Sequence, residues 1–278
     1  MNDTAQALQK TAMQIRRKII EMIGVGKAGH IGGSCSLAEV MAVLYFHKLH
    51  IDPQNPKLPE RDRVILSKGH SAPVQYACLA MLGYFDESEF NQFKRLGGTL
   101  QGHPDLTKVP GIEANTGSLG QGLSMAAGMA AGLKLDGLPA KVYCIVGDGE
   151  LAEGQIWEAA MAASHYRLDN LRMIIDKNNY QAMGAISARM NSNPVKEKML
   201  AFGWHVIEAD GHNTASIMNA LDEADTLKDK PVCIIARTMK GKCISFAENN
   251  CAFHNGILTQ ELYDTALSDI GRGGGENA

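Results

Sequence analysis

Apolar residues along the chain follow two different periods, and each predicts a type of regular structure. Clear apolar runs at 142–146, 171–175, 204–207 and 232–236, with a brief one at 64–66, are bounded by polar residues or glycine. Such runs are typical of strands buried on both faces of a sheet. Segments with helical period lie between them and span 5–23, 37–48, 73–82, 88–95, 120–135, 155–165, 194–202, 214–227 and 259–269. The sequence Ser36-Leu37-Ala38-Glu39 has the form of a capping box and predicts a helix start.

The order of these segments predicts the fold class. From about residue 140 onward, strands alternate with helices of ten or more residues, which indicates βαβ units. We therefore expect an α/β fold with a parallel sheet flanked by helices. No internal repeat or long linker interrupts the pattern, so one domain is expected over residues 1–270, with 271–278 as a flexible, glycine-rich C-terminal tail.

Composition narrows the class of protein. The 278 residues are 45% hydrophobic and 21% charged, which provides a large core and excludes global disorder. A net charge of -3 and a pI near 6.3 give no electrostatic reason to expect nucleic acid or an anionic membrane as partner. No apolar run is long enough to span a bilayer, and the first residues lack the apolar centre of a signal peptide. The six cysteines form no CxxC pair, so we expect reduced, mostly buried thiols in a cytoplasmic protein.

Polar residues follow four successive predicted strands, and two of these strand ends predict a cation site. Asp148 offers a carboxylate between two glycines, and Asn178 offers an amide oxygen after the next strand. Both ligand types suit Mg²⁺ or Ca²⁺, and strand ends of parallel sheets are where ligands bind. Because Mg²⁺ usually keeps waters and substrate phosphates as further ligands, the pattern indicates a diphosphate bound through the metal.

Two glycine clusters invite different interpretations. Residues 116–122 open the predicted helix at 120–135, where free amide groups attract phosphate; tight packing of the loop is the alternative. Residues 24–29 match the GxGxxG pattern of dinucleotide-binding folds, but they follow a helix-period segment rather than a strand. We therefore do not expect a nicotinamide-dinucleotide site there.

Histidines in glycine-flanked loops are the third chemical signal. His30, His70, His103 and His254 each lie in such a loop, from which a side chain can project into a cleft. Imidazole exchanges protons and hydrogen-bonds hydroxyl groups near neutral pH, although any one of these residues alone is as well explained as an exposed or capping histidine. His47 and His50 form an HxxH pair without the glutamate of a zinc motif and are expected at the surface.

Taken together, these motifs resemble a known family. Gly147-Asp148-Gly149, followed one strand later by Asn178-Asn179, is similar to the thiamine diphosphate fingerprint. Combined with GKAGHIGG, LSKGHSAP, GHPD, TGSLGQGLSMAAGMA and KGKCISFAEN, it resembles the N-terminal, diphosphate-binding domain of transketolase over residues 10 to 260. The form resembled is the split enzyme, in which this thiamine diphosphate-binding fold, the PP domain, is a separate subunit.

The resemblance implies roles for particular residues. Mg²⁺ would be bound by Asp148, Asn178 and the backbone carbonyl of Tyr180. Thiamine diphosphate would be bound by residues on several loops: His70, Gly117, Ser118, Leu119, Gly147, Gly149, Glu150, Asn178 and His254. The catalytic histidines would be His30 and His103, facing the sugar, and His254. Glu153 matches a family glutamate near the domain interface. The implied reaction transfers a two-carbon glycolaldehyde unit from a ketose phosphate to an aldose phosphate.

The resemblance also implies a partner. In the family, the glutamate that activates the cofactor lies on the pyrimidine-binding domain, together with most substrate-phosphate ligands. We therefore expect activity only with a C-terminal transketolase subunit that carries the pyrimidine-binding and C-terminal domains, in a two-plus-two heterotetramer.

Two departures and three alternatives remain open at this stage. The sequence His254-Asn255-Gly256 has an extra residue relative to the family, and Cys243 occupies a position that is commonly glycine. Both bear on substrate choice, and a branched pentulose phosphate is an alternative to ordinary pentose phosphates. A deoxyxylulose phosphate synthase-like or dehydrogenase E1-like subunit is the second enzyme interpretation, and a non-catalytic cofactor-binding module is the third.

Overall fold

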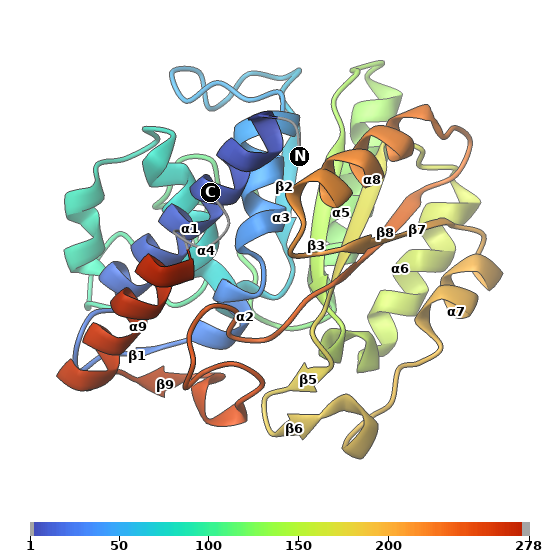
Figure 1. Ribbon diagram of the computed structural model, residues 1–278. Coiled ribbons are helices and arrows are strands. Elements are labelled where there is room, and N and C mark those ends of the chain that lie inside the picture. Colours follow the sequence, from blue (N-terminus) through green and yellow to red (C-terminus); the bar gives the residue numbers. More distant parts are fainter. Residues whose placement is uncertain (1–2, 274–278) are drawn as a thin grey trace.

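A five-stranded parallel sheet organises the chain (Figure 1). The structure is a computed structural model and describes residues 3–273. From one edge to the other, the strands are β2 (Arg63–Leu66), β3 (Val142–Gly147), β4 (Leu171–Lys177), β8 (Val232–Arg237) and β7 (His205–Asp210). All four pairings are parallel, so the carboxyl ends of the strands lie at one edge of the sheet. The predicted α/β fold with a parallel, helix-flanked sheet is confirmed.

Alternate residues of each strand enter two different hydrophobic cores, because successive side chains point to opposite faces of a sheet. On β3, Tyr143 and Ile145 belong to the first core, whereas Cys144 and Val146 belong to the second. This is why the strands read as continuous apolar runs in the sequence. A strand covered on both faces has no side open to water.

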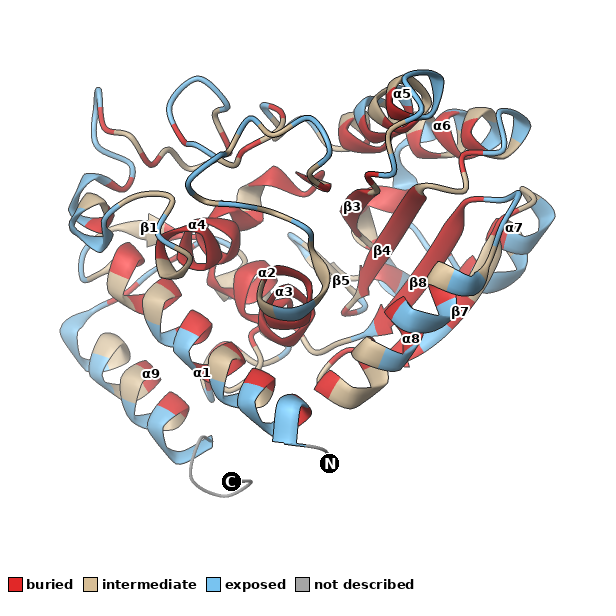
Figure 2. Ribbon diagram, turned by 90° about the horizontal axis from the view of Figure 1, so that it is seen from above, coloured by how far each residue is buried: buried red, intermediate tan, exposed pale blue. Residues whose placement is uncertain are grey.

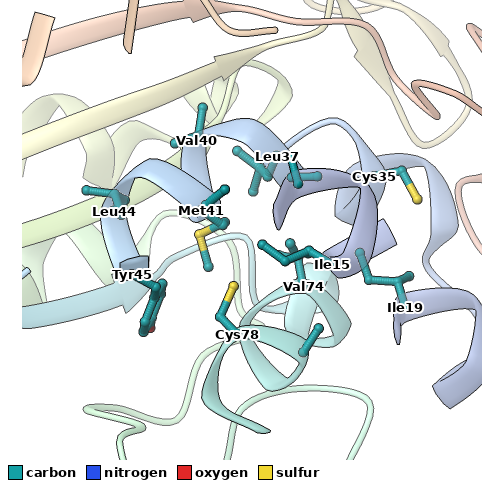
Figure 3. Close-up of a cluster of buried hydrophobic side chains, with 14 of the residues drawn as sticks. Ile15, Ile19, Cys35, Leu37, Val40, Met41, Leu44, Tyr45, Val74 and Cys78 are labelled. Carbon is teal, nitrogen blue, oxygen red and sulfur yellow. The ribbon is translucent and has the colours of Figure 1, made fainter. Parts of the chain in front are cut away.

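The first face of the sheet is covered by helices from both ends of the chain: α1 (Asp3–Ile23), α2 (Ile31–Cys35), α3 (Ala38–Val43), α4 (Ala72–Met81), α8 (Thr214–Thr226) and α9 (Gln260–Gly273). Helix α1 is amphipathic and buries Ile15 and Ile19 against α3 and α4 (Figure 3). Nearly all of α4 is buried, so its apolar residues show no preferred side.

The second face is covered by α5 (Gln121–Leu135), α6 (Gly154–His165) and α7 (Val195–Ala201). Figure 2 shows α5 and α6 side by side at one end of the sheet and α7 beside β7 and β8. Helix α5 begins directly after Gly120 and packs on β2, β3 and β4, so its first turn lies at the edge where the strands end. This placement positions the glycine-rich loop that precedes the helix.

Short elements complete the described chain. Strands β1 (Ala28–Gly29) and β9 (Gly256–Ile257) pair antiparallel, as do β5 (Tyr180–Gln181) and β6 (Gly184–Ala185). Figure 1 shows both pairs along the lower side of the molecule. Single turns of 3₁₀ helix lie at Gly69–Ser71, Glu87–Gln92, Gly149–Ala152, Ile186–Ala188 and Cys251–Phe253, and a π-helical turn at Leu44–Lys48 follows α3.

The predicted strands and most predicted helices are present, with differences of a few residues at their ends. The helix expected over 88–95 is a short 3₁₀ helix, Glu87–Gln92, after which Lys94 has a positive φ. Residues 31–35, not expected to be regular, form α2. The segment at 24–29 follows a helix, as expected, and is not the turn of a strand–loop–helix unit.

The capping-box prediction is wrong. Helix α3 begins after Leu37, and no side chain caps it. The hydroxyl of Ser36 donates instead to Asp176 Oδ2 at 2.7 Å and to the Gly33 carbonyl at 3.1 Å. Glu39 is drawn away by Arg16, because pairing a buried guanidinium matters more than a backbone cap.

Other expectations from the sequence have mixed outcomes. Residues 271–273, expected in the C-terminal tail, lie in α9, and residues 274–278 lie outside the described residues. All six cysteines are free, and four of them are buried, as expected. His47 and His50 are exposed. Within residues 3–273, no helix is both long and apolar enough to cross a membrane.

A buried ion pair joins α1 to α3. The guanidinium of Arg16 donates to both carboxylate oxygens of Glu39, at 2.7 and 2.6 Å, and both side chains are almost fully buried. His212, after β7, adds a third contact: its Nε2 accepts from the Met239 N–H at 2.7 Å, so its Nδ1–H donates to Glu39 at 3.0 Å. Burial opposes ionisation of Glu39, but Arg16 and His212 outweigh it and lower its pKa to about 2.

We predict that Glu39→Ala lowers the free energy of unfolding by about 3–5 kcal/mol, because it leaves the Arg16 charge buried without a partner. The matched control is Glu21→Ala, which removes a partly exposed pair with Arg17 on α1 and should cost at most about 1 kcal/mol. Chemical denaturation near neutral pH measures both values. Equal costs for the two variants would contradict the prediction.

Candidate active site

Four strand ends contribute side chains to one cavity of about 470 Å³ at the carboxyl edge of the sheet. Lys68 follows β2, Asp148 follows β3, Asn178 follows β4 and Lys240 lies beyond β8. The parallel pairing of these strands brings the four residues together, although they are far apart in the sequence. The prediction that ligand-binding residues gather at this edge therefore has a physical location.

Asp148 is buried at this edge and held by backbone groups. Its Oδ1 accepts from the Gly149 N–H at 2.9 Å, and its Oδ2 accepts from the Asn179 N–H at 2.5 Å. Burial and the nearby charge of Asp176 raise the pKa of Asp148 to about 7. A cation beside this carboxylate would favour its ionised form, because an opposite charge offsets both effects.

The amide of Asn178 is oriented by a buried carboxylate. Its Nδ2 donates to Asp176 Oδ2 at 2.9 Å, and its Oδ1 accepts from the Tyr180 N–H at 3.1 Å. Asp176 also accepts from Lys68, Ser36 and Thr238. Burial opposes its ionisation, but Lys68 and the other donors outweigh that effect and lower the pKa of Asp176.

The donor set fits a hard cation. A carboxylate oxygen from Asp148 and an amide oxygen from Asn178 line the same cavity as Tyr180. Among residues 3–273 there is no group of three or more histidine, cysteine or acidic side chains arranged to hold a metal. A metal here would therefore also use backbone, water or phosphate oxygens, which is the habit of Mg²⁺.

The four loop histidines converge beside this cavity. The ring of His30 lies 5.1 Å from that of His70, 6.2 Å from His103 and 5.3 Å from His254, measured between centroids. The rings of His70 and His254 lie 4.9 Å apart. Four histidines from loops spread over more than 200 residues form one cluster, which the interpretation of isolated surface histidines does not explain.

All four imidazoles are held in the neutral form. Burial, followed by the charges of neighbouring groups, lowers the pKa of His30 to about 3 and of His254 to about 4. The pKa of His70 lies far below its ordinary value for the same reasons, and burial followed by Lys94 lowers that of His103. A neutral imidazole has one donor and one acceptor nitrogen, so it can hydrogen-bond a hydroxyl in either sense.

Close contacts explain two glycines in the predicted phosphate loop. Gly117 has a φ of +151°, and a Cβ there would lie 2.8 Å from the ring of His103. Gly122, on the first turn of α5, packs on Ser67, where a Cβ would lie 2.4 Å from the hydroxyl. The loop therefore serves the close packing of the site, whichever ligand its amide groups contact.

Glu150 uses its carboxylate within the protein. Its Oε1 accepts from the Ser67 hydroxyl and from the Gly120 N–H, and its Oε2 accepts from the Gly147 N–H at 3.1 Å. Burial raises its pKa. The side chain thus ties the end of β2, the start of α5 and the end of β3 to one another.

The residues expected at the site fall into two groups. Those that line the cavity are His70, Leu119, Gly147, Asp148, Gly149, Glu150, Glu153, Asn178, Tyr180 and His254. His30 and His103 lie at its margin through their ring contacts. Gly117 packs on His103, and neither Gly117 nor Ser118 is among the lining residues.

Sequence reasoning missed several polar residues of the site. Lys68 and Lys240 are buried and line the cavity, and Lys240 Nζ lies 3.1 Å from His254 Nδ1. Burial, followed by the charge of Lys68, lowers the pKa of Lys240 to about 8. The available signal was a lysine soon after a buried strand, a position where solvent exposure is the usual expectation. Asp176 was missed because a strand residue gives no sign of its partners.

The two sequence departures lie differently with respect to the site. Asn255 is exposed, and His254 still joins the histidine cluster. Cys243 has a φ of +69°, a conformation that glycine adopts without strain, and it lines a separate cavity with Lys242 and His212. Neither Asn255 nor Cys243 is among the residues that line the candidate active site.

Comparison with known proteins gives a consistent result. The family described as transketolase, thiamine diphosphate binding domain, matches residues 7–271. A 6-deoxy-6-sulfo-D-fructose transketolase subunit of Clostridium sp. is 45% identical over 99% of this chain and 100% of its own length. One of the two subunits of the apulose-4-phosphate transketolase of Phocaeicola vulgatus is 38% identical over 95% of this chain and 94% of its own.

Single-chain transketolases match over part of their length. The human transketolase is 39% identical over 95% of this chain, which spans 42% of the human protein. The crystal structure of transketolase from Campylobacter jejuni has a TM-score of 0.89 and 33% identity over 98% of this chain and 43% of its own. The chain therefore belongs to the transketolase family and corresponds to its thiamine diphosphate-binding, N-terminal subunit in transketolases divided between two chains.

Proposed function

We propose that this chain is the cofactor-holding subunit of a transketolase that moves a two-carbon glycolaldehyde unit from a ketose phosphate to an aldose phosphate. The observation that carries the proposal is the cluster of four neutral loop histidines beside the cavity that Asp148 and Asn178 line. Sugar hydroxyls need donors and acceptors at fixed positions, and neutral imidazoles supply both.

The cavity is suited to a metal-bound diphosphate. Asp148, Asn178 and the carbonyl of Tyr180 would hold Mg²⁺, while His70, His254 and the amide of Gly149 would contact the diphosphate. Lys68 and Lys240 add positive charge to the same wall, which favours an anionic ligand. When bound, thiamine diphosphate supplies the nucleophilic carbon and the electron sink for ketol transfer.

The remaining histidines are proposed to act on the sugar. His30 and His103 would orient hydroxyl groups of the ketose and help to move protons at those oxygens. Their rings lie 6.2 Å apart at the margin of the cavity, and neither is among its lining residues. Because both imidazoles are neutral, each can accept a proton from a hydroxyl and return it without first losing one.

A partner subunit is proposed to complete the site. It would carry the pyrimidine-binding and C-terminal domains, the glutamate that activates the cofactor, and most ligands of the substrate phosphate, in a cytoplasmic two-plus-two assembly. Two facts support this: the chain spans 42% of the human single-chain relative, and its relatives that match end to end are named as subunits. Glu153, which lines the cavity, is proposed to lie near the interface.

We expect ketol transfer only after the chain is combined with a C-terminal transketolase subunit, thiamine diphosphate and Mg²⁺. The donors to compare are xylulose 5-phosphate, 6-deoxy-6-sulfo-D-fructose and apulose 4-phosphate, the last two taken from the names of relatives. Pyruvate consumption is measured in parallel, since it would indicate a deoxyxylulose phosphate synthase-like or dehydrogenase-like subunit. Full transfer activity of the chain alone would contradict the need for a partner.

Asp148→Ala should raise the Mg²⁺ concentration needed for thiamine diphosphate binding by at least about 100-fold, since even indirect partners of a metal are worth about 10–100-fold. Calorimetric titration of the reconstituted complex measures the effect. The matched control is Asp136→Ala, which changes an exposed aspartate after α5. Unchanged affinity in Asp148→Ala would refute the metal assignment.

His103→Ala should lower kcat/KM for the ketose by about 10²–10⁴-fold, the usual contribution of a positioned acid–base group. The dissociation constant for thiamine diphosphate should stay unchanged, because His103 lies beyond the residues that line the cavity. His47→Ala, at an exposed histidine, is the control. If His103→Ala instead weakens cofactor binding and leaves the KM for the ketose unchanged, His103 does not belong to the sugar side of the site.

A further inference from the structure

Lys94 lies outside the cofactor cavity, at the start of the loop that leads to His103. Its φ of +57° turns the chain directly after the 3₁₀ helix at Glu87–Gln92. Its backbone N–H donates to the Leu100 carbonyl at 2.8 Å and closes residues 94–100 into a loop. This geometry sends the side chain back across the segments that carry two of the clustered histidines.

The side chain of Lys94 contacts the backbone of both histidine segments. Its ammonium donates to the carbonyl of Ala28 at 2.7 Å, and Ala28 lies on β1, two residues before His30. Its stem packs on Gly102, the residue before His103; a Cβ at position 102 would lie 2.8 Å from Lys94 Cε. One side chain thus bridges two loops that are separated by about 70 residues and are not joined by strand pairing.

Each loop has one further support of its own. Strand β1 pairs with β9 through Ala28 and Ile257, which steadies the His30 segment. The hydroxyl of Tyr76 donates to the His103 carbonyl at 3.0 Å, which steadies the other segment. Neither of these contacts joins the His30 loop to the His103 loop, so Lys94 supplies the direct connection between them.

We infer that Lys94 is a positioning residue: its ammonium and stem fix the spacing of His30 and His103, and through them the recognition of the sugar. The inference rests on the proposed function, in which these two histidines face the ketose. A small displacement of such groups is costly, because misplacing a reacting group by about 1 Å can reduce rates about 100-fold.

The charge of Lys94 acts in the same direction as its geometry. After burial, the positive charges of His254 and Lys94 lower the pKa of His30, and Lys94 alone follows burial for His103. The titratable groups that face His30 are Lys94, His70, His103, His254 and Lys240; those that face His103 are Lys94 and His30. Removing the ammonium should therefore raise the pKa of both histidines.

The test compares Lys94→Met, which keeps much of the side-chain stem but removes its charge and donor, with Lys94→Arg, which keeps both. The matched control is Arg95→Met, the next residue of the same exposed loop. Histidine ring signals of the full-length chain are titrated by NMR. Lys94→Met should raise the pKa of His30 and His103 but not of His254, which Lys94 does not shift.

Kinetics of the reconstituted complex provide the second measurement. Lys94→Met should lower kcat/KM for the ketose by about 10–100-fold, mainly through KM, with its acid limb moved to higher pH and cofactor affinity unchanged. Lys94→Arg and Arg95→Met should behave like the unmodified chain. The inference is overturned if Lys94→Met changes neither titration nor kinetics, or if Lys94→Arg is damaged equally.

The two measurements also separate this inference from the function on which it rests. If the unmodified complex transfers no ketol unit to an aldose, the proposed function fails. The NMR titration of the chain then still decides whether Lys94 acts on both histidines. If the complex is active and the titrations of Lys94→Met match those of the unmodified chain, the inference fails and the function stands.

Discussion

The carboxylate of Asp176 is the contact on which the geometry of the candidate active site depends. It is fully buried, and it accepts hydrogen bonds from Ser36, Lys68, Asn178 and Thr238. These four donors come from the segment before α3 and from the ends of β2, β4 and β8. A buried charge must be paired and hydrogen-bonded to be tolerated, so the need to satisfy one carboxylate draws four separate segments to one point. The amide of Asn178 takes its orientation from the same contact.

The electrostatics of the cavity follow from this arrangement. Lys68 is held at the wall by Asp176, and Lys240 is held close to His254. Their charges, added to burial, keep the neighbouring histidines neutral. The wall is consequently cationic where a diphosphate would be bound, and uncharged but rich in hydrogen-bonding groups where a sugar would be bound. A metal-bound anion and a polyhydroxylated substrate need these two different environments within one small volume.

Much of the fold could be predicted because it depends on local pattern. Continuous apolar runs identified the strands, since strands covered on both faces have no polar side. Helical period identified α1 and α8 for the opposite reason: each has one wet face and one dry face. The capping box at Ser36 failed because two long-range partners, Asp176 and Arg16, outcompeted a local bond. The helix expected over 88–95 failed where the chain turns at Lys94 to bridge two loops.

For the site, the sequence by itself determined which residues are chemically capable: a carboxylate between glycines after one strand, an amide after the next, and four histidines in glycine-flanked loops. It also determined that parallel strands would place the first two at one edge. Only the tertiary structure decided that the four histidines meet, that Lys68 and Lys240 are buried among them, and that Glu150 and Lys94 connect neighbouring segments. The reason is that side-chain chemistry and strand period are local properties, whereas burial, pairing and pKa depend on which distant segments the sheet brings together.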